Sequence, residues 1–183
     1  CASDLHIYDE DSFRHALASL GKGIRRYKPD VVVCLGDVFD CVPFLQQYGA
    51  EFHRTLMDLH RPCVFVYGNH DGSSTNKGKG DLGWAAFTQV FGSAQSVYSF
   101  GALRLLTVGD QQPDSGWLEF AQAEAAPGTM VLSHGPLEQR ALDALEEKGV
   151  RLVLSGHYHA FFRRLGAQGK CEQRGQAPFL FAG

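Results

Sequence analysis

Short polar clusters that follow apolar runs are the residues of this chain best suited to chemistry. In order, they are Asp4-Leu5-His6, Gly36-Asp37-Val38-Phe39-Asp40, Gly68-Asn69-His70-Asp71, Ser133-His134 and Gly156-His157-Tyr158-His159. Their carboxylate, amide and imidazole groups form a mixed oxygen and nitrogen donor set, which suits Mn, Fe, Zn, Co or Ni rather than Ca. The clusters therefore predict a metal site.

The composition of the clusters indicates two metal ions rather than one. Asp37 has two carboxylate oxygens and can bridge a pair of cations, while Asp4 and His6 are spaced two apart, as are His157 and His159. In an extended segment or a tight loop, such a pair can reach one ion together. Two ions about 3.5–4 Å apart form the clamp used for in-line displacement at phosphorus. This inventory predicts metal-dependent phosphoester hydrolysis without a nucleophilic Ser or Cys.

Strands are expected immediately before four of the clusters. The runs Val31–Leu35, Cys63–Tyr67, Thr129–Leu132 and Arg151–Leu154 are rich in apolar residues and lack polar alternation. Such runs are typical of strands that are covered on both faces. Because ligands in open α/β sheets collect at the carboxyl ends of strands, we expect the clusters to converge.

Helices and further strands are expected between these runs. Helical spacing predicts helices from Phe13 to Ile24 with a stop at Pro29, from Phe44 to Leu59, and from Leu137 to Leu145 with a stop at Gly149. The segments 97–100 and 103–108 read as a hairpin. Late strands are expected at Phe161–Leu165 and at 179–182. Alternating strands and helices indicate an α/β fold with two sheets covered by helices.

Length and composition favour one globular domain. The chain has 183 residues, is 44% hydrophobic and carries a formal net charge of -3, so it has no overall basic field for nucleic acid. It contains neither an apolar run of membrane-spanning length nor a charged-then-apolar leader. The spacing of its cysteines matches no zinc or redox motif. We expect a cytoplasmic protein with no membrane partner.

The clusters, taken together and in this order, resemble those of the calcineurin-like metallophosphoesterase superfamily, outside its protein-phosphatase branch. The resemblance runs from Asp4 to His159. It implies a four-layer α-β-β-α sandwich of two mixed sheets flanked by helices. It also implies a metal-bridging hydroxide that attacks phosphorus, and a non-catalytic subunit on the same fold exists within the superfamily.

By the same resemblance, each cluster has a role. The first metal would be held by Asp4, His6, Asp37 and His159, and the second by Asn69, His134 and His157, with Asp37 shared. His70 would lie beside the scissile phosphate as general acid or transition-state stabiliser. Asp71 would orient His70, and Asp40 would support a ligand loop from behind.

Three departures from the family pattern refine this expectation. Cys41 stands where the protein-phosphatase branch has arginine, and Asp71 stands where that branch has glutamate. Only three residues precede Asp4, where the family has a full strand. We therefore expect a single domain over residues 1–183 that lacks part of its first strand.

The favoured function is a dinuclear phosphodiesterase, with Mn as the favoured metal and a small molecule or nucleotide as substrate. A diester is preferred over a monoester because no dedicated motif for a terminal phosphate is visible. A DNA or RNA nuclease with the same chemistry is the alternative, and a non-catalytic interaction module on the same fold is the second alternative. Substrate specificity is expected in the loops at 72–83 and 111–116.

Overall fold

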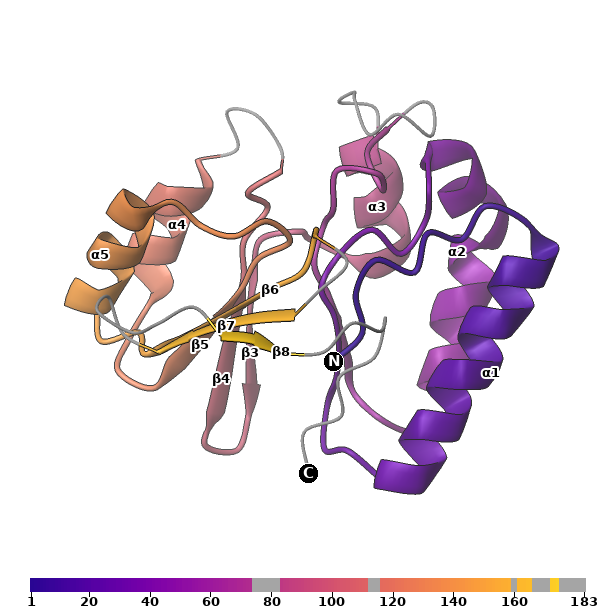
Figure 1. Ribbon diagram of the computed structural model, residues 1–183, viewed down its shortest axis with the longest axis horizontal. Helices are drawn as coiled ribbons and strands as arrows, with labels where there is room; N and C mark the ends of the chain where they lie inside the picture. The colour runs from indigo at the N-terminus through magenta and orange to yellow at the C-terminus, as the bar shows by residue number, and fades with distance from the viewer. Residues whose placement is uncertain (74–82, 112–115, 159–160, 166–171, 175–183) are drawn as a thin grey trace.

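Two sheets form the middle of the molecule in the computed structural model, which describes residues 1–73, 83–111, 116–158, 161–165 and 172–174 (Figure 1). The smaller sheet pairs β1 (Val32–Cys34) with β2 (Cys63–Phe65) in parallel. The larger sheet has the order β3-β4-β5-β6-β7-β8. Its strands are β3 (Ser96–Phe100), β4 (Leu103–Thr107), β5 (Thr129–Leu132), β6 (Leu152–Ser155), β7 (Phe161–Leu165) and β8 (Glu172–Arg174).

The direction of the strands brings several loops to one edge. β4, β5 and β6 run parallel, whereas β3 and β4 form an antiparallel hairpin and β7 and β8 are antiparallel additions. The amino-terminal segment adds isolated parallel bridges from Ala2 to Cys34 and from Ile7 to Phe39. The segment that begins at Ala2 therefore lies beside β1 and the loop that follows it.

Helices cover the outer faces of both sheets (Figure 1). α1 (Glu10–Tyr27), α2 (Val42–Met57) and α3 (Gly83–Phe91) lie beside the smaller sheet, and α4 (Trp117–Glu124) and α5 (Gln139–Glu147) lie beside the larger one. α1 begins at a capping box formed by Asp9 and Ser12. It ends at Tyr27, and the capping residue Lys28 has a φ of 47°, in the left-handed region just before Pro29.

Alternate residues of the short strands enter different apolar layers. In β1, Val32 and Cys34 face the helices, whereas Val33 faces the other sheet. In β4, Leu105 faces the smaller sheet and Leu106 faces α4 and α5. Both faces of β1 are thus buried, which explains why its sequence is a continuous apolar run.

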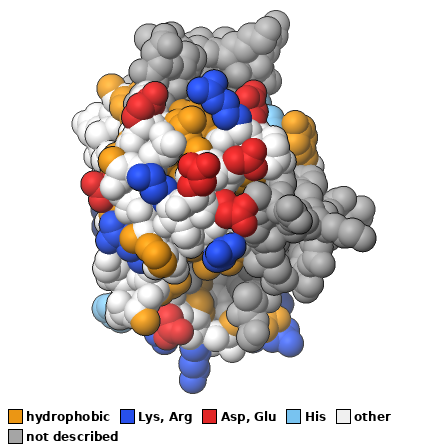
Figure 2. Space-filling view, turned by 90° about the vertical axis from the view of Figure 1, so that its left-hand side faces the viewer, with side chains coloured by type: hydrophobic (Ala, Val, Ile, Leu, Met, Phe, Trp, Pro, Cys, Tyr) orange, Lys and Arg blue, Asp and Glu red, His pale blue; other side chains and the backbone are white. Residues whose placement is uncertain are grey.

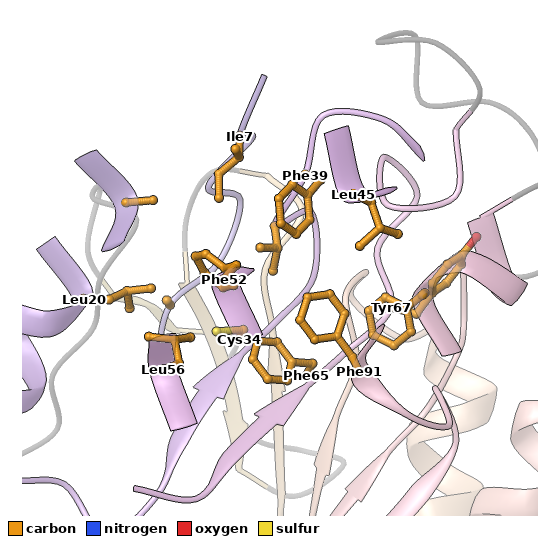
Figure 3. Packing of buried hydrophobic residues seen from close by; sticks show 14 of the residues in the cluster. Ile7, Leu20, Cys34, Phe39, Leu45, Phe52, Leu56, Phe65, Tyr67 and Phe91 are labelled. Atoms are coloured by element: carbon orange, nitrogen blue, oxygen red, sulfur yellow. The ribbon is translucent and has the colours of Figure 1, made fainter. Parts of the chain in front are cut away.

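Aromatic side chains fill the layer between the smaller sheet and its helices (Figure 3). Phe52 of α2 packs edge-on against Phe39, with ring centroids 5.7 Å apart. Phe65 of β2 stacks on Phe91 of α3 at 4.2 Å. Cys34 is buried in the same layer, and burial raises the pKa of its thiol.

The expected α/β architecture of two sheets flanked by helices is confirmed. The smaller sheet contains two parallel strands within the described residues, so the mixed pattern belongs to the larger sheet. α3, α4 and β8 were not anticipated by the sequence, and the strand expected at 179–182 lies outside the described residues. No described helix has the length and apolar character needed to cross a membrane.

Candidate metal centre

Loops at the carboxyl ends of strands bring the sequence clusters together. The first loop, which holds Asp4 and His6, runs beside the loop after β1: the Asp4 N–H donates to the Gly36 carbonyl at 3.0 Å, and the His6 N–H donates to the Asp37 carbonyl at 3.0 Å. The loop after β6 joins them, because the His157 N–H donates to Asp4 Oδ2 at 3.1 Å. Clusters distant in sequence therefore meet at one edge of the fold.

Close backbone approach in this region requires glycine at two positions. A Cβ on Gly68 would lie 2.3 Å from Asp37 Oδ1, and a Cβ on Gly36 would lie 2.5 Å from His134 Nδ1. Gly36 also has a φ of 91°. Any side chain at either position would displace a candidate ligand.

Four candidate ligands have left-handed backbone geometry. The φ values of Asp4, His6, Asp37 and His157 are 54°, 46°, 51° and 73°. Such conformations cost about 1–3 kcal/mol for residues other than glycine and persist where surrounding contacts impose them. The cost is concentrated on the residues that the sequence singled out for metal binding.

Two groups of possible ligand atoms share Asp37. His6, Asp37 and His70 form one group, and Asp37, His134 and His157 form the other, with the atoms of each group within 4.8 Å of one another. Asp37 Oδ2 lies 3.9 Å from His6 Nε2 and 3.1 Å from His134 Nε2. A single buried carboxylate is thus positioned between two clusters of imidazoles.

His134 is oriented for binding through its Nε2 atom. Its Nδ1 contacts the Leu35 carbonyl at 2.7 Å, which requires a proton on Nδ1. Nε2 lies 3.1 Å from His157 Nδ1 and 3.2 Å from Asn69 Oδ1, in addition to Asp37. One ring proton could serve only one of these three electron-rich atoms, whereas a cation among them would satisfy all three.

The pKa values of Asp37, His134 and His157 depend on one another. Burial alone would raise the pKa of Asp37, but the hydrogen bond and positive charge of His134 outweigh it and lower that pKa. Burial alone would lower the pKa of His134, but Asp37 reverses the effect and raises it to about 9. The pKa of His157 is lowered by burial and then by the neighbouring charge of His134. The site therefore favours one positive charge beside Asp37.

Asp4 lies outside both groups but fits a cation. Its Oδ2 accepts the His157 N–H at 3.1 Å and the Ser3 hydroxyl. Its Oδ1 is buried and accepts no hydrogen bond within the described residues. Such an unsatisfied carboxylate oxygen is costly unless a cation or water binds it, so the donor set present here fits the metal pair that the sequence predicts.

Asp40, rather than Asp71, contacts the ring of His70. His70 Nδ1 lies 3.1 Å from the Asp40 carbonyl and 3.3 Å from its carboxylate. The same carboxylate lies 3.1 Å from His6 Nδ1. Asp40 thus supports two histidines, which extends the supporting role expected from the sequence.

The carboxylate of Asp71 accepts hydrogen bonds from backbone N–H groups rather than orienting His70, which corrects the role expected from the sequence. Its buried carboxylate accepts the N–H groups of Phe39 at 2.9 Å and Gly68 at 3.1 Å, so it joins the loops that present Asp37 and Asn69. Burial, followed by the negative charge of Asp37, raises the pKa of Asp71 to about 7. The turn at Gly68–Asp71 points this carboxylate inward, away from the ring that precedes it in sequence.

Asp110 is a site residue that the sequence analysis missed. Its two carboxylate oxygens accept the N–H groups of His134 and Gly135, each at 3.1 Å. Gln111 Nε2 adds a contact at 2.6 Å, and burial raises the pKa of Asp110. The signal was present, because Asp110 also follows a strand, but it stands alone among residues without other metal-binding types.

Some of the residues expected at the site lie outside the described part of the chain. His159, most of the 72–83 loop and residues 112–115 lie outside the described residues. The structure therefore brings together His6, Asp37, His70, His134 and His157, with Asn69, Asp4 and Asp40 in contact with them.

Comparison with known proteins identifies the family of this chain. A family model described as calcineurin-like phosphoesterase matches residues 1–161. No curated protein sequence matches the chain significantly. A purple acid phosphatase from yellow lupin (Lupinus luteus) has a similar fold, with a TM-score of 0.65, 14% identity and coverage of 88% of this chain and 37% of that one. The chain thus spans well under half of that phosphatase.

A dimetal phosphatase from Danio rerio is similar over nearly its whole length, with a TM-score of 0.56, 12% identity and coverage of 96% of this chain and 95% of that one. At these identities the two structures show the fold alone. The family match covers most of the sequence, and that family hydrolyses phosphoesters with two divalent metals. This chain belongs to the calcineurin-like phosphoesterase family.

Proposed function

We propose that this chain is a dinuclear phosphodiesterase whose metal ions share Asp37. The observation that carries the proposal is the position of Asp37 in both groups of candidate ligands. His6, Asp4 and His159 would complete one metal site, and Asn69, His134 and His157 the other. Two bound divalent ions supply a lowered pKa for an attacking water and neutralise phosphate oxygens.

The protein residues contribute positioning and proton transfer. Asp40 holds the rings of His6 and His70 through its carboxylate. His70 lies at the edge of the first group, with its ring centroid 4.6 Å from that of His6. His70 would donate a proton or a hydrogen bond to the leaving oxygen, as a general acid within hydrogen-bond reach of the substrate.

The charges around the site favour a diester over a monoester. The described side chains in contact with the two groups include the Asp40 carboxylate, the Asn69 amide and the Tyr158 ring, and no described Lys or Arg is among them. A monoester dianion carries more charge than a diester and gains more from a cationic side chain. Because no described Lys or Arg adds to the charge of the metal ions, the singly charged diester is the better fit.

The test is a comparison of substrates and metals. Metal-stripped protein is reloaded with Mn²⁺, Fe²⁺, Zn²⁺, Co²⁺ or Ni²⁺ and assayed with bis(p-nitrophenyl) phosphate and p-nitrophenyl phosphate. We expect Mn²⁺ to give the highest turnover and the diester to have the higher kcat/KM. His15→Ala, an exposed change on α1, is the control and should retain activity. A folded, metal-loaded protein without turnover of either ester would refute the proposal.

A nuclease function is less favoured by the visible charges. Figure 2 shows the face of α4 and α5, where acidic and basic side chains are interspersed rather than collected into a basic tract. Phosphate-backbone binding usually needs such a tract. Single-stranded DNA and RNA belong in the same substrate panel, and salt-sensitive cleavage of either would favour the nuclease.

A further inference from the structure

Exposed aromatic residues of this protein include one directly beside the candidate metal centre. Tyr8, Tyr27, Met57 and Tyr158 are the large apolar side chains exposed within the described residues, and Tyr158 is the most exposed at 65%. An aromatic ring left in water forgoes the stabilisation that burial would give it. Tyr27 and Met57 are the last residues of α1 and α2, whereas Tyr158 directly follows His157. The position of Tyr158 beside a candidate ligand therefore suggests a functional role, which the positions of Tyr27 and Met57 at helix ends do not.

The backbone fixes Tyr158 at this location. The His157 N–H donates to Asp4 Oδ2 at 3.1 Å, and the Tyr158 N–H donates to the Gly156 carbonyl at 3.0 Å. His157 also has the left-handed φ of 73°. The turn that presents His157 to the second ligand group thus sets the direction of the chain at Tyr158, and the ring emerges from a constrained loop.

A series of aromatic rings leads from the metal centre to Tyr158. The ring of His134 lies 4.9 Å from that of His157, and the ring of His157 lies 5.0 Å from that of Tyr158, at an interplanar angle of 62°. His157 contacts Tyr158 in an edge-type rather than a face-to-face arrangement, and Tyr158 remains 65% exposed. A phosphoester bound near Asp37 must direct its organic groups outward, and one that passes His157 meets this ring.

We propose that Tyr158 determines specificity by stacking on the organic group of the substrate, which favours phosphoesters that carry a planar aromatic ring. The inference rests on the proposed phosphoesterase function and names the substrate class for the same site. A planar aromatic ring can stack offset on the phenol and gains an aromatic-pair contribution, which a saturated ring of equal size lacks. Tyrosine also orders few rotatable bonds on binding, so the entropic cost is small. Arylmethyl groups and nucleobases both meet this requirement.

The first test measures binding without turnover. Benzylphosphonate and cyclohexylmethylphosphonate have the same charge and similar size, and only the first is planar. Calorimetric titration of the Mn²⁺-loaded protein should show about tenfold tighter binding of benzylphosphonate, which equals about 1.4 kcal/mol. Tyr158→Leu should bring the two affinities together, and Tyr158→Phe should preserve the difference because it keeps the ring. Tyr27→Leu, a change at an exposed tyrosine at the end of α1, should leave both affinities unchanged.

The second test repeats the comparison with turnover. Methyl benzyl phosphate and methyl cyclohexylmethyl phosphate have leaving groups of similar basicity, so a difference in kcat/KM reports recognition rather than intrinsic reactivity. Tyr158→Leu should lower kcat/KM about tenfold for the benzyl ester and little for the other. Equal binding of the two phosphonates by the unmodified protein, or equal losses for both ligands in Tyr158→Leu, would overturn the inference. Selective binding without hydrolysis of any ester would instead overturn the phosphoesterase function.

Discussion

Asp37 belongs to both groups of candidate ligands, whereas His70 belongs to the first group only. Oδ2 of Asp37 lies near imidazoles of both groups, and Oδ1 of Asp37 accepts the His70 N–H at 2.8 Å. Removal of this carboxylate should therefore affect both metal sites. His70 differs because its ring is held by Asp40 and contributes to one edge of the first group only.

Substitution of these two residues should separate metal binding from chemistry. Asp37→Ala should lose most of both metal ions, since no other described residue belongs to both groups. His70→Ala should retain most of its metal and lose about 10²–10⁴-fold in kcat, the usual contribution of a general acid. Metal content by elemental analysis and steady-state kinetics measure the two effects. Equal metal loss in the two variants would contradict this division of roles.

Asp110 offers a test of how the His134 loop is held. Asp110→Asn replaces one accepting oxygen by an NH₂ group that faces a backbone N–H, because the carboxylate accepts both His134 and Gly135. We expect a loss of about 1–3 kcal/mol in the free energy of unfolding, together with weaker metal binding. Urea denaturation and metal titration measure these changes.

Asp143→Asn is the matched control for Asp110. Asp143 accepts a hydrogen bond from Gln139 on α5, as Asp110 does from Gln111, but it is exposed. Its substitution should change stability by no more than about 0.5 kcal/mol. Similar losses at the two positions would show that burial of the Asp110 carboxylate is not what matters.

At the scale of elements, α2 holds the smaller sheet through aromatic packing. Phe52 is fully buried and contacts Phe39 and Phe65, whereas Met57 of the same helix is 45% exposed. Phe52→Ala should cost about 3–5 kcal/mol because the surrounding layer cannot fully close the cavity. Met57→Ala should cost about 0.5 kcal/mol or less. Urea denaturation of both variants measures the contrast, and equal costs would refute this account of the layer.

Strands with uninterrupted apolar runs could be predicted from the sequence because both of their faces are buried. α3 and α4 could not, for reasons visible in their ends. α4 begins after a left-handed Gly116 without a side-chain cap and has one fully buried residue, Ala121. α3 is nine residues long and begins at Gly83. α4 lacks the start signal that Asp9 and Ser12 give α1.

The candidate site, like the fold, could be predicted from the sequence only in part. Its main residues could be predicted because each follows a strand and has a ligand-type side chain. The partners of Asp40, Asp71 and Asp110 could not, since each depends on loops from other parts of the chain. Asp71 shows this most clearly: its neighbour in sequence is His70, but its partners in space are Phe39 and Gly68.

At the scale of the whole molecule, His53 should contribute to the pH dependence of stability. Its ring contacts Phe65 and Phe91 at centroid distances of 5.6 and 5.7 Å, and burial lowers its pKa below the usual 6.5. The unfolded chain therefore binds more protons in this range, so stability rises with pH. The contribution is complete above about pH 6.5 and is lost as the pH falls through the folded-state pKa.

Non-titrating substitutions test this linkage. Relative to the unmodified protein, His53→Phe should become progressively more stable as the pH is lowered from 7.5 to 5, because it has no proton to bind. His53→Leu should show the same trend with a different offset, since it packs differently against Phe65. Urea midpoints across this pH range measure the trend. A constant difference at every pH would exclude His53 as a contributor.

The hydrogen bond from the His157 N–H to Asp4 joins residues 153 positions apart, and the contact of His134 with Leu35 joins residues 99 positions apart. Contacts of such long sequence separation form late in folding, because the loop between them must close first. During synthesis, the first ligand loop leaves the ribosome long before its partners exist. A nascent chain would thus expose Asp4 and His6 without the geometry to retain a metal ion, and metal capture would coincide with completion of the fold.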